Sequence, residues 1–332
     1  MEINPPAWYE RPVAESLAAR VLGGDRGAVA RLIRLVDDRD PAGLAHMPGI
    51  CRAAAGASIV GVTGPPGSGK STIVDRLIDA GRARGRRIGV VAVDPSSPFT
   101  GGAILGDRIR MQRHAADDDV FIRSLATRGR LGGLSASARD VLAVLAAAGF
   151  RTLLLETVGV GQDEIDVTRV ADTVLLVVAP GAGDAVQTLK AGVIEIADVF
   201  VVNKMDRDGA YETAREMEQM IAFGASRPGG WTPPVVLACA ADGRGIDEIV
   251  ACVDRREEWM RSSGADVRQR TENARFALID LVRARLDAVL DGPIAAELDA
   301  ASDRIASGAS DPHTEAAGLV DLLARSAATN RP

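Results

Sequence analysis

The chain of 332 residues carries 39 Lys and Arg residues against 45 Asp and Glu residues, a net charge of −6. That balance disfavours a dedicated nucleic-acid-binding protein, because neutralising phosphates requires a basic excess. The three cysteines form no CxxC pair, which argues against a disulfide framework or a thiolate zinc site. No apolar run approaches the ~18–20 residues of a membrane span, and the N-terminus has prolines and charges where a signal peptide has an apolar core. We therefore expect a cytoplasmic protein.

Residues 1–56 are predicted to form an N-terminal helical extension. Apolar residues recur at helical spacing from residue 12 to residue 55, and the pattern is interrupted at Gly23-Gly24 and at Pro41. Because glycine pairs and prolines interrupt helices, we expect two or three short helices in this region.

From residue 57 to residue 258, short apolar runs alternate with helical segments. Continuous apolar runs are typical of buried parallel strands, whose two faces are both covered by helices. They predict an α/β fold with a doubly wound, mainly parallel sheet. From 259 to 332 the pattern predicts a C-terminal helical region with helices over 268–291, 293–307 and 312–328. The predicted strands are SIVGVT, RIGVVAVD, DVFIRSL, RTLLLET, TVLLVVA, DVFVVNK and PVVLACA.

The first apolar run leads directly into a glycine-rich loop and a helical segment. The loop matches G-x-x-x-x-G-K-[ST], and its strand–loop–helix context is typical of a P-loop. Its backbone N–H groups can surround a β-phosphate, Lys70 can neutralise phosphate oxygens, and the Ser71 hydroxyl can bind Mg²⁺. The sequence therefore predicts a P-loop NTPase. The predicted loop residues are Gly64, Pro65, Pro66, Gly67, Ser68, Gly69, Lys70, Ser71 and Thr72.

A second motif, NKMD at residues 203–206, follows the apolar run DVFVV. The Asp206 carboxylate can accept two hydrogen bonds from guanine N1–H and the 2-amino group, a donor pair that adenine does not offer. Lys204 can stack its stem on the purine, and Asn203 can tie neighbouring loops together. The predicted ligands are therefore GTP and GDP.

A third stretch, at the end of the run PVVLACA, is a candidate base-binding loop. Its backbone N–H groups can reach guanine O6, although an ordinary buried strand end explains so short a stretch nearly as well. The candidate residues are Ala238, Cys239 and Ala240.

Four residues are candidates for the γ-phosphate end of the site. Glu156 ends the run RTLLLE and can hold a Mg²⁺-bound water, and Gly159 can bring its N–H to the γ-phosphate. Asp94 ends another run, and Asp107 lies in the loop that follows it. Carboxylates at the carboxyl ends of parallel strands face the ligand crevice, while a helix cap or a turn remains the other interpretation. The catalytic candidates are Lys70, Asp94, Asp107 and Glu156, and the Mg²⁺ candidates are Ser71, Asp94, Asp107 and Glu156.

Five strings together resemble the MeaB/ArgK family of P-loop GTPases, to which the methylmalonic aciduria type A protein belongs. They are GVTGPPGSGKST, VDPSSPFTGGAILGDRIRM, ETVGVGQDE, PGAGDAVQTLKAGVIEIAD and VVNKMD. The resemblance covers nearly the whole chain. It implies a GTP-hydrolysing, metallochaperone-like G protein that gates adenosylcobalamin loading into an acyl-CoA mutase, above all methylmalonyl-CoA mutase, and protects that enzyme. It also implies a homodimer joined through C-terminal helices.

Carried over by motif, the resemblance places Asp94 and Asp107 in a first switch region and Glu156 in a second. An additional switch loop, which communicates the nucleotide state to the mutase, would contain Asp184, Gln187 and Lys190. The chain departs from the family where a GDELQ-like stretch reads GDAVQ and where the usual Ser-Ala of the base loop reads Cys-Ala. The first change puts the detailed partner contact in doubt, and the second keeps the backbone contacts.

Two other functions fit parts of the sequence. A P-loop kinase that phosphorylates a transport-related protein would also need a P-loop, but most kinases use ATP and have no need of a guanine-reading carboxylate. A metal-insertion GTPase commonly carries His- or Cys-rich tracts, which are absent from this sequence. Hydrolysis is expected to be slow without a partner, because the sequence offers no evident arginine finger and no glutamine directly after Gly159.

Overall fold

The computed structural model describes residues 16–94, 110–126, 136–157, 166–181, 196–223 and 230–329. The chain divides into two compact units, Met1–Asn273 and Ala274–Pro332. Within the described residues, no helix combines the length and apolar character that crossing a membrane requires. The domain boundaries predicted after residues 56 and 258 stay predictions.

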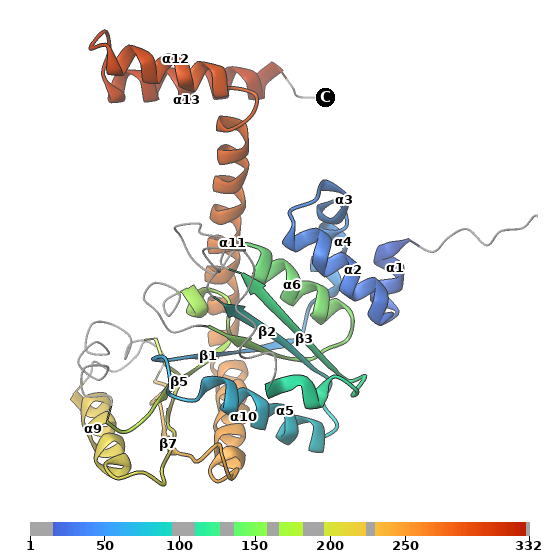
Figure 1. Cartoon of the computed structure of the whole chain (residues 1–332), viewed down its shortest axis with the longest axis vertical. Coiled ribbons are helices and arrows are strands. Elements are labelled where there is room, and N and C mark those ends of the chain that lie inside the picture. The colour runs from blue at the N-terminus through green and yellow to red at the C-terminus, as the bar shows by residue number, and fades with distance from the viewer. Residues whose placement is uncertain are drawn as a thin grey trace, which may run out of the picture. The chain divides into compact units, whose positions relative to one another are not determined.

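The first unit is built around a parallel sheet of seven strands in the described residues, in the order β3-β2-β4-β1-β5-β6-β7 (Figure 1). Strand β1 lies at the centre, where Val60 is in register with Leu154 of β4 and with Thr173 of β5. The chain winds from β1 toward β3 on one side and toward β7 on the other, so the predicted doubly wound parallel sheet is confirmed. The strands are β1 (Ser58–Thr63), β2 (Ile88–Asp94), β3 (Val120–Ala126), β4 (Thr152–Glu156), β5 (Thr173–Val178), β6 (Val199–Val202) and β7 (Val235–Leu237).

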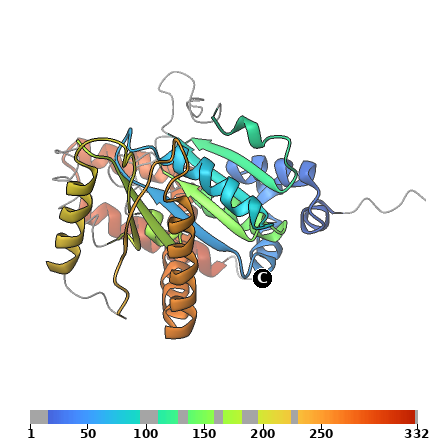
Figure 2. The same ribbon diagram turned by 90° about the horizontal axis from the view of Figure 1, so that it is seen from below.

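Helices cover both faces of the sheet, which explains why its strands are apolar without alternation. On one face, α5 (Lys70–Ala83) and α10 (Ile246–Ser263) lie beside each other and pack on alternate residues of the central strands (Figures 1 and 2). On the opposite face, α6 (Ala136–Ala147) packs on β2 and β4, and α9 (Ala210–Phe223) packs on β6 and β7.

The N-terminal segment contains four short helices within residues 16–56, where two or three were expected. Aspartates account for part of the division, because Asp25 and Asp40 each accept a backbone N–H at the start of a new helix. The segment buries Val29, Leu32 and Ile33 against α6, so it belongs to the same core as the sheet. The helices are α1 (Leu17–Leu22), α2 (Arg26–Asp37), α3 (Pro41–Leu44) and α4 (Met47–Ala53).

The C-terminal part is helical, as expected. Helix α11 (Ala265–Leu290) begins in the first unit and ends in the second. In the second unit α12 (Ala295–Ala306) and α13 (Pro312–Thr329) lie side by side (Figure 1). Arg304 of α12 forms a two-pronged ion pair with Glu315 of α13, which joins the two helices.

Candidate nucleotide-binding site

The predicted site residues gather at the carboxyl ends of β1, β4, β6 and β7. This is the edge at which open parallel sheets bind ligands. β1 leads into the loop 64–69, β4 ends at Glu156, and β6 leads into Asn203. The loop is followed at once by α5, whose first residue is Lys70. A helix N-terminus therefore opens where a phosphate would bind.

Two glycines let this loop pass close to its neighbours. Gly64 has φ +138°, and a Cβ there would lie 2.0 Å from the Val177 carbonyl oxygen of β5. Gly69 has φ +95°, and a Cβ there would lie 2.3 Å from Asn203 Nδ2. Larger residues would meet both the steric penalty of a positive φ and these contacts. The motif glycines are thus required by the backbone path itself.

Lys70 is buried at the centre of the loop, with 8% of its surface exposed. Its Nζ donates to the carbonyl oxygens of Gly64 at 2.9 Å and Pro65 at 3.1 Å. These acceptors are neutral, so phosphate oxygens are stronger competitors for the ammonium group. The loop holds the cation where it can neutralise an anionic ligand.

Ser71 and Glu156 meet across the gap between α5 and β4. The Ser71 hydroxyl donates to Glu156 Oε1 at 2.6 Å, and Glu156 is buried with 4% exposed. Next to Glu156, the Thr157 hydroxyl donates to the Thr63 hydroxyl at 3.0 Å.

Hard oxygen ligands of this kind suit Mg²⁺, which protein sites usually hold through one or two side chains, with phosphates and waters completing the shell. In the described residues no group of three or more His, Cys, Asp and Glu side chains could hold a metal by itself. The Ser71–Glu156 pair fits a nucleotide-assisted Mg²⁺ site.

Asn203 joins three parts of the site. Its Nδ2 donates to the Ser68 carbonyl of the P-loop at 2.9 Å, and its Oδ1 accepts the Ala240 N–H at 3.0 Å. The adjacent Lys204 has φ +60°, and its Nζ donates to the Gly67 carbonyl at 2.6 Å. The NKMD segment is therefore joined by hydrogen bonds to the phosphate-binding loop on one side and to Ala240, after β7, on the other.

Asp206 is exposed, and its Oδ1 accepts a hydrogen bond from the buried Cys239 thiol at 3.2 Å. This hydrogen bond, together with one from its own backbone, holds the pKa of the Asp206 carboxyl below its ordinary value. Burial raises the pKa of the Cys239 thiol, so the sulfur keeps its proton and stays a donor. The pair presents an ionised, acceptor-only carboxylate of the kind that can bind the guanine N1–H and 2-amino donors.

The three candidate N–H groups of the base loop are already engaged. Ala238 N–H donates to Val202 O at 2.9 Å, Cys239 N–H to Arg244 O at 2.9 Å, and Ala240 N–H to Asn203 Oδ1. Sequence reasoning missed Arg76, which reaches this loop from α5. Its sequence position carries no signal of that role, because a lone arginine six residues after the P-loop lysine looks like any exposed helical residue.

The remaining candidates lie at the edge of the described structure or outside it. Asp94 is the last residue of β2, at the ligand edge of the sheet, and its side chain is outside the description. Pro66 is exposed in the loop and Thr72 is partly buried on α5. The candidates outside the described residues are Asp107, Gly159, Asp184, Gln187 and Lys190.

Comparison with known proteins decides the family. The family described as methylmalonyl Co-A mutase-associated GTPase MeaB matches residues 29–293. The chain belongs to the MeaB family. The family resemblance seen in the sequence is thereby confirmed, and the chain is a GTPase that binds guanine nucleotides.

Relatives and a solved structure agree with MeaB membership. A Pyrococcus horikoshii protein named as a GTPase is 48% identical over 256 residues, which cover 76% of this chain and 80% of that protein. GTPase ArgK of Escherichia coli is 38% identical over 247 residues, covering 72% and 74% of the two chains. The crystal structure of a LAO/AO transport system kinase matches with a TM-score of 0.69 at 24% identity, covering 92% of this chain and 96% of that one. This last likeness shows the fold alone.

Proposed function

We propose that this GTPase uses Mg²⁺-dependent hydrolysis of GTP to gate adenosylcobalamin loading into an acyl-CoA mutase and to protect that enzyme, with methylmalonyl-CoA mutase as the first candidate. The description of the family carries the proposal, because it names a mutase-associated GTPase. The Ser71–Glu156 contact supports it, since it joins the P-loop helix to the end of β4, where a change at the γ-phosphate can move a neighbouring element. We place this activity in the cytoplasm.

In the proposed reaction, water attacks the γ-phosphate and the products are GDP and phosphate. Lys70 neutralises the phosphate oxygens, and Ser71 and Glu156 would hold Mg²⁺, which when bound would supply positive charge against the charge that develops on the phosphates. The place of Asp94 at the carboxyl end of β2 suits a role beside the attacking water, and Asp107 and Gly159 are proposed for the same end of the site. Asp184, Gln187 and Lys190 are proposed to pass the nucleotide state to the mutase.

The base site is proposed to select guanine. Asp206 accepts from the N1–H and 2-amino groups, Lys204 covers the purine with its stem, and Asn203 holds the loops in place. The hydrogen bonds of Asn203 to the Ser68 carbonyl and the Ala240 N–H support this assignment, because they bring the base-reading segment against the phosphate loop before a ligand binds.

We also propose that the protein is a homodimer joined through its C-terminal helices. On α11, Leu278, Leu281 and Val282 are between 42% and 63% exposed, and Leu286 is 43% exposed. Spacings of three and four residues place these side chains on one face of the helix. An exposed apolar stripe of this kind is typical of a helix that packs against another protein surface.

Steady-state hydrolysis of GTP, with ATP as the control and with methylmalonyl-CoA mutase added or omitted, tests the proposed function. We expect GTP-selective turnover that rises when the mutase is added. Equal turnover with and without the mutase would overturn the partner assignment. Stable transfer of labelled phosphate to a protein would support the kinase alternative instead.

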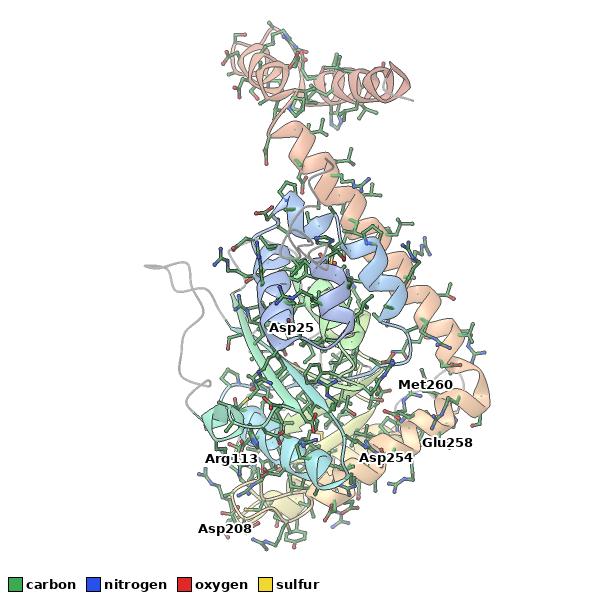
Figure 3. All side chains as sticks on the ribbon, turned by 90° about the vertical axis from the view of Figure 1, so that its right-hand side faces the viewer. Asp25, Arg113, Asp208, Asp254, Glu258 and Met260 are labelled. Carbon is green, nitrogen blue, oxygen red and sulfur yellow. The ribbon has the colours of Figure 1, made fainter. Side chains whose placement is uncertain are left out.

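The Mg²⁺ assignment has its own test. Glu156→Gln keeps the shape of the side chain and removes its charge, so we expect a higher Mg²⁺ requirement and turnover lowered by about tenfold or more. Glu258→Gln is the matched control, because Glu258 lies exposed on α10 and pairs with Arg261 (Figure 3). An unchanged Mg²⁺ dependence in Glu156→Gln would remove this residue from the metal site.

A further inference from the structure

Arg76 of α5 binds two successive backbone carbonyl groups, the last one of the base loop (residues 238–240) and the one that follows it. Its Nε donates to Ala240 O at 2.8 Å, and its Nη2 donates to Ala241 O at 2.6 Å. A guanidinium group is planar and rigid, so two donors that bind two acceptors fix an orientation as well as a distance. Arg76 lies less than two helical turns after Lys70. One short stretch of helix therefore carries both the phosphate-binding Lys70 and Arg76. We call the two hydrogen bonds of Arg76 to Ala240 O and Ala241 O the clamp.

The clamp sets the direction of one backbone donor. In a trans peptide the C=O and N–H groups point in opposite directions. Because the Ala240 carbonyl points to Arg76, the Ala241 N–H of the same peptide points away from α5. In the described part of the chain, the other N–H groups of residues 238–244 donate hydrogen bonds, and the Ala241 N–H has no acceptor. It is an available donor two residues from Cys239, the thiol partner of Asp206.

A surface ion pair does not account for Arg76. Its Nη1 lies 3.8 Å from Asp79 Oδ2, which is beyond hydrogen-bond distance, and both side chains are about one third exposed. Asp79 instead has a hydrogen bond from Arg113, which lies beside α5 (Figure 3). The strong contacts of Arg76 are those to the base loop.

We infer that Arg76 is a specificity-determining positioning residue, which holds the Ala241 N–H toward O6 of a 6-oxopurine nucleotide. The inference rests on the proposed base site and extends it. Asp206 reads the donors on one side of the guanine ring, and the clamped loop reads the acceptor on the other side. Adenine presents an amino group where guanine has O6, so a backbone donor there favours guanine a second time.

Three nucleotides separate this role from a structural one. GTP and ITP both carry O6, whereas the triphosphate of 2-aminopurine riboside lacks O6 and keeps the 2-amino group. For Arg76→Met we expect GTP and ITP to bind about tenfold more weakly, the loss of roughly one hydrogen bond, while binding of the 2-aminopurine nucleotide stays the same. The kcat at saturating GTP stays within about twofold of wild type. Equal weakening of all three nucleotides, or of none, would overturn the inference.

Two further variants complete the test. Arg84→Met is the matched control, because Arg84 directly follows the last residue of the same helix and contacts Ala80 O and Asp247 instead of the base loop. We expect this variant to bind all three nucleotides like wild type. Arg76→Lys can make one of the two carbonyl contacts and recovers part of the GTP affinity. If the wild-type protein binds the 2-aminopurine nucleotide as tightly as GTP, the proposed base site itself fails. If wild type prefers GTP and Arg76→Met keeps that full preference, the role of Arg76 alone fails.

Discussion

The carboxyl ends and the amino ends of the sheet strands are built from different contacts. At the carboxyl ends, Lys70 and Lys204 donate to backbone carbonyls of the P-loop, contacts that a phosphate or a base can replace. At the amino ends, both carboxylate oxygens of Asp198 have protein partners. Oδ1 pairs with Arg256 at 3.0 Å, and Oδ2 accepts the Val174 N–H at 2.9 Å. Asp172 similarly accepts the Ile59 N–H at 2.8 Å.

This difference separates ligand binding from stability within one sheet. The guanidinium of Arg256 also stacks against Trp231 and Trp259, 5.3 Å and 4.5 Å from their ring centroids. Ion pairs between buried side chains and aromatic contacts with half-buried tryptophans hold the amino ends together. The carboxyl ends instead keep replaceable contacts. Substitutions at the two ends should therefore change different measured quantities, and the following predictions test that separation in order of expected size.

Lys70→Ala should have the largest effect. Removing the buried cation leaves the γ- and β-phosphates without their main neutralising group, so we expect GTP hydrolysis to fall by on the order of 10²–10³-fold. The melting temperature should stay close to that of wild type, because the hydrogen bonds of Lys70 to Gly64 O and Pro65 O lie within the phosphate-binding loop and outside the core of the sheet. Hydrolysis like that of the wild type would refute the P-loop assignment.

Arg256→Met should give the reverse result at the other end of the sheet. It removes the ion pair that Arg256 makes with the buried Asp198, and the free energy of unfolding should fall by about 3–5 kcal/mol. The KM for GTP should not change. Urea unfolding together with GTP kinetics measures both quantities, and Arg261→Met, which breaks an exposed ion pair with Glu258, is the stability control. A raised KM at unchanged stability would contradict the separation of the two ends.

Asp206→Asn should change which base is preferred. An amide loses the ionised acceptor for guanine but can donate to the 2-oxo group of xanthine. We expect GTP binding to weaken by about tenfold to a hundredfold relative to XTP. Competition binding measures the ratio, and Asp208→Asn is the control, because Asp208 is an exposed neighbour in the sequence (Figure 3). The same GTP-to-XTP ratio in both variants would exclude Asp206 from the base site.

Asp172→Asn should show the smallest effect, in the pH dependence of stability. Burial, helped by the nearby Glu257 and opposed by the hydrogen bond from the Ile59 N–H, raises the pKa of Asp172 to about 6. The folded state therefore holds a proton that the unfolded state has released between pH ~4 and ~6, and the stability this contributes is lost as pH rises through about 6.

The amide removes that loss and can still accept the Ile59 N–H. We expect Asp172→Asn to gain roughly 2 kcal/mol more unfolding free energy at pH 8 than at pH 4. Thermal unfolding across this range measures the gain. An equal gain at both pH values would point to packing instead of titration.

The fold class was predictable because parallel strands covered by helices are continuously apolar, as TVLLVV of β5 shows with every residue buried. The strand order was not predictable, because the sequence of a strand such as β4 does not indicate that it lies between β2 and β1. The division of the N-terminal segment was also underestimated. There, a one-turn helix capped by Asp40 is too short for a periodic pattern to reveal.

The site shows a similar limit. The P-loop and NKMD motifs are readable because their spacing carries the chemistry. The contacts between them depend on which strand ends meet, so the Ser71–Glu156 hydrogen bond and the clamp by Arg76 could be found only in three dimensions. The roles of Asp94, Asp107, Gly159 and the additional switch residues stay predictions.

The central position of β1 has a consequence for synthesis on the ribosome. β1 comes before the other strands of the described residues, yet its partners in the sheet are β4 and β5, and Gly64 at its end lies against the carbonyl of Val177. Closing such long loops is slow, because the chain loses entropy before the strands can pair. The P-loop therefore cannot reach its folded conformation until β5 has left the ribosome, when more than half of the chain has been synthesised. Nascent chains truncated before β5 should not bind GTP. Binding of GTP by a longer nascent chain would indicate that β1 has paired with β4 and β5.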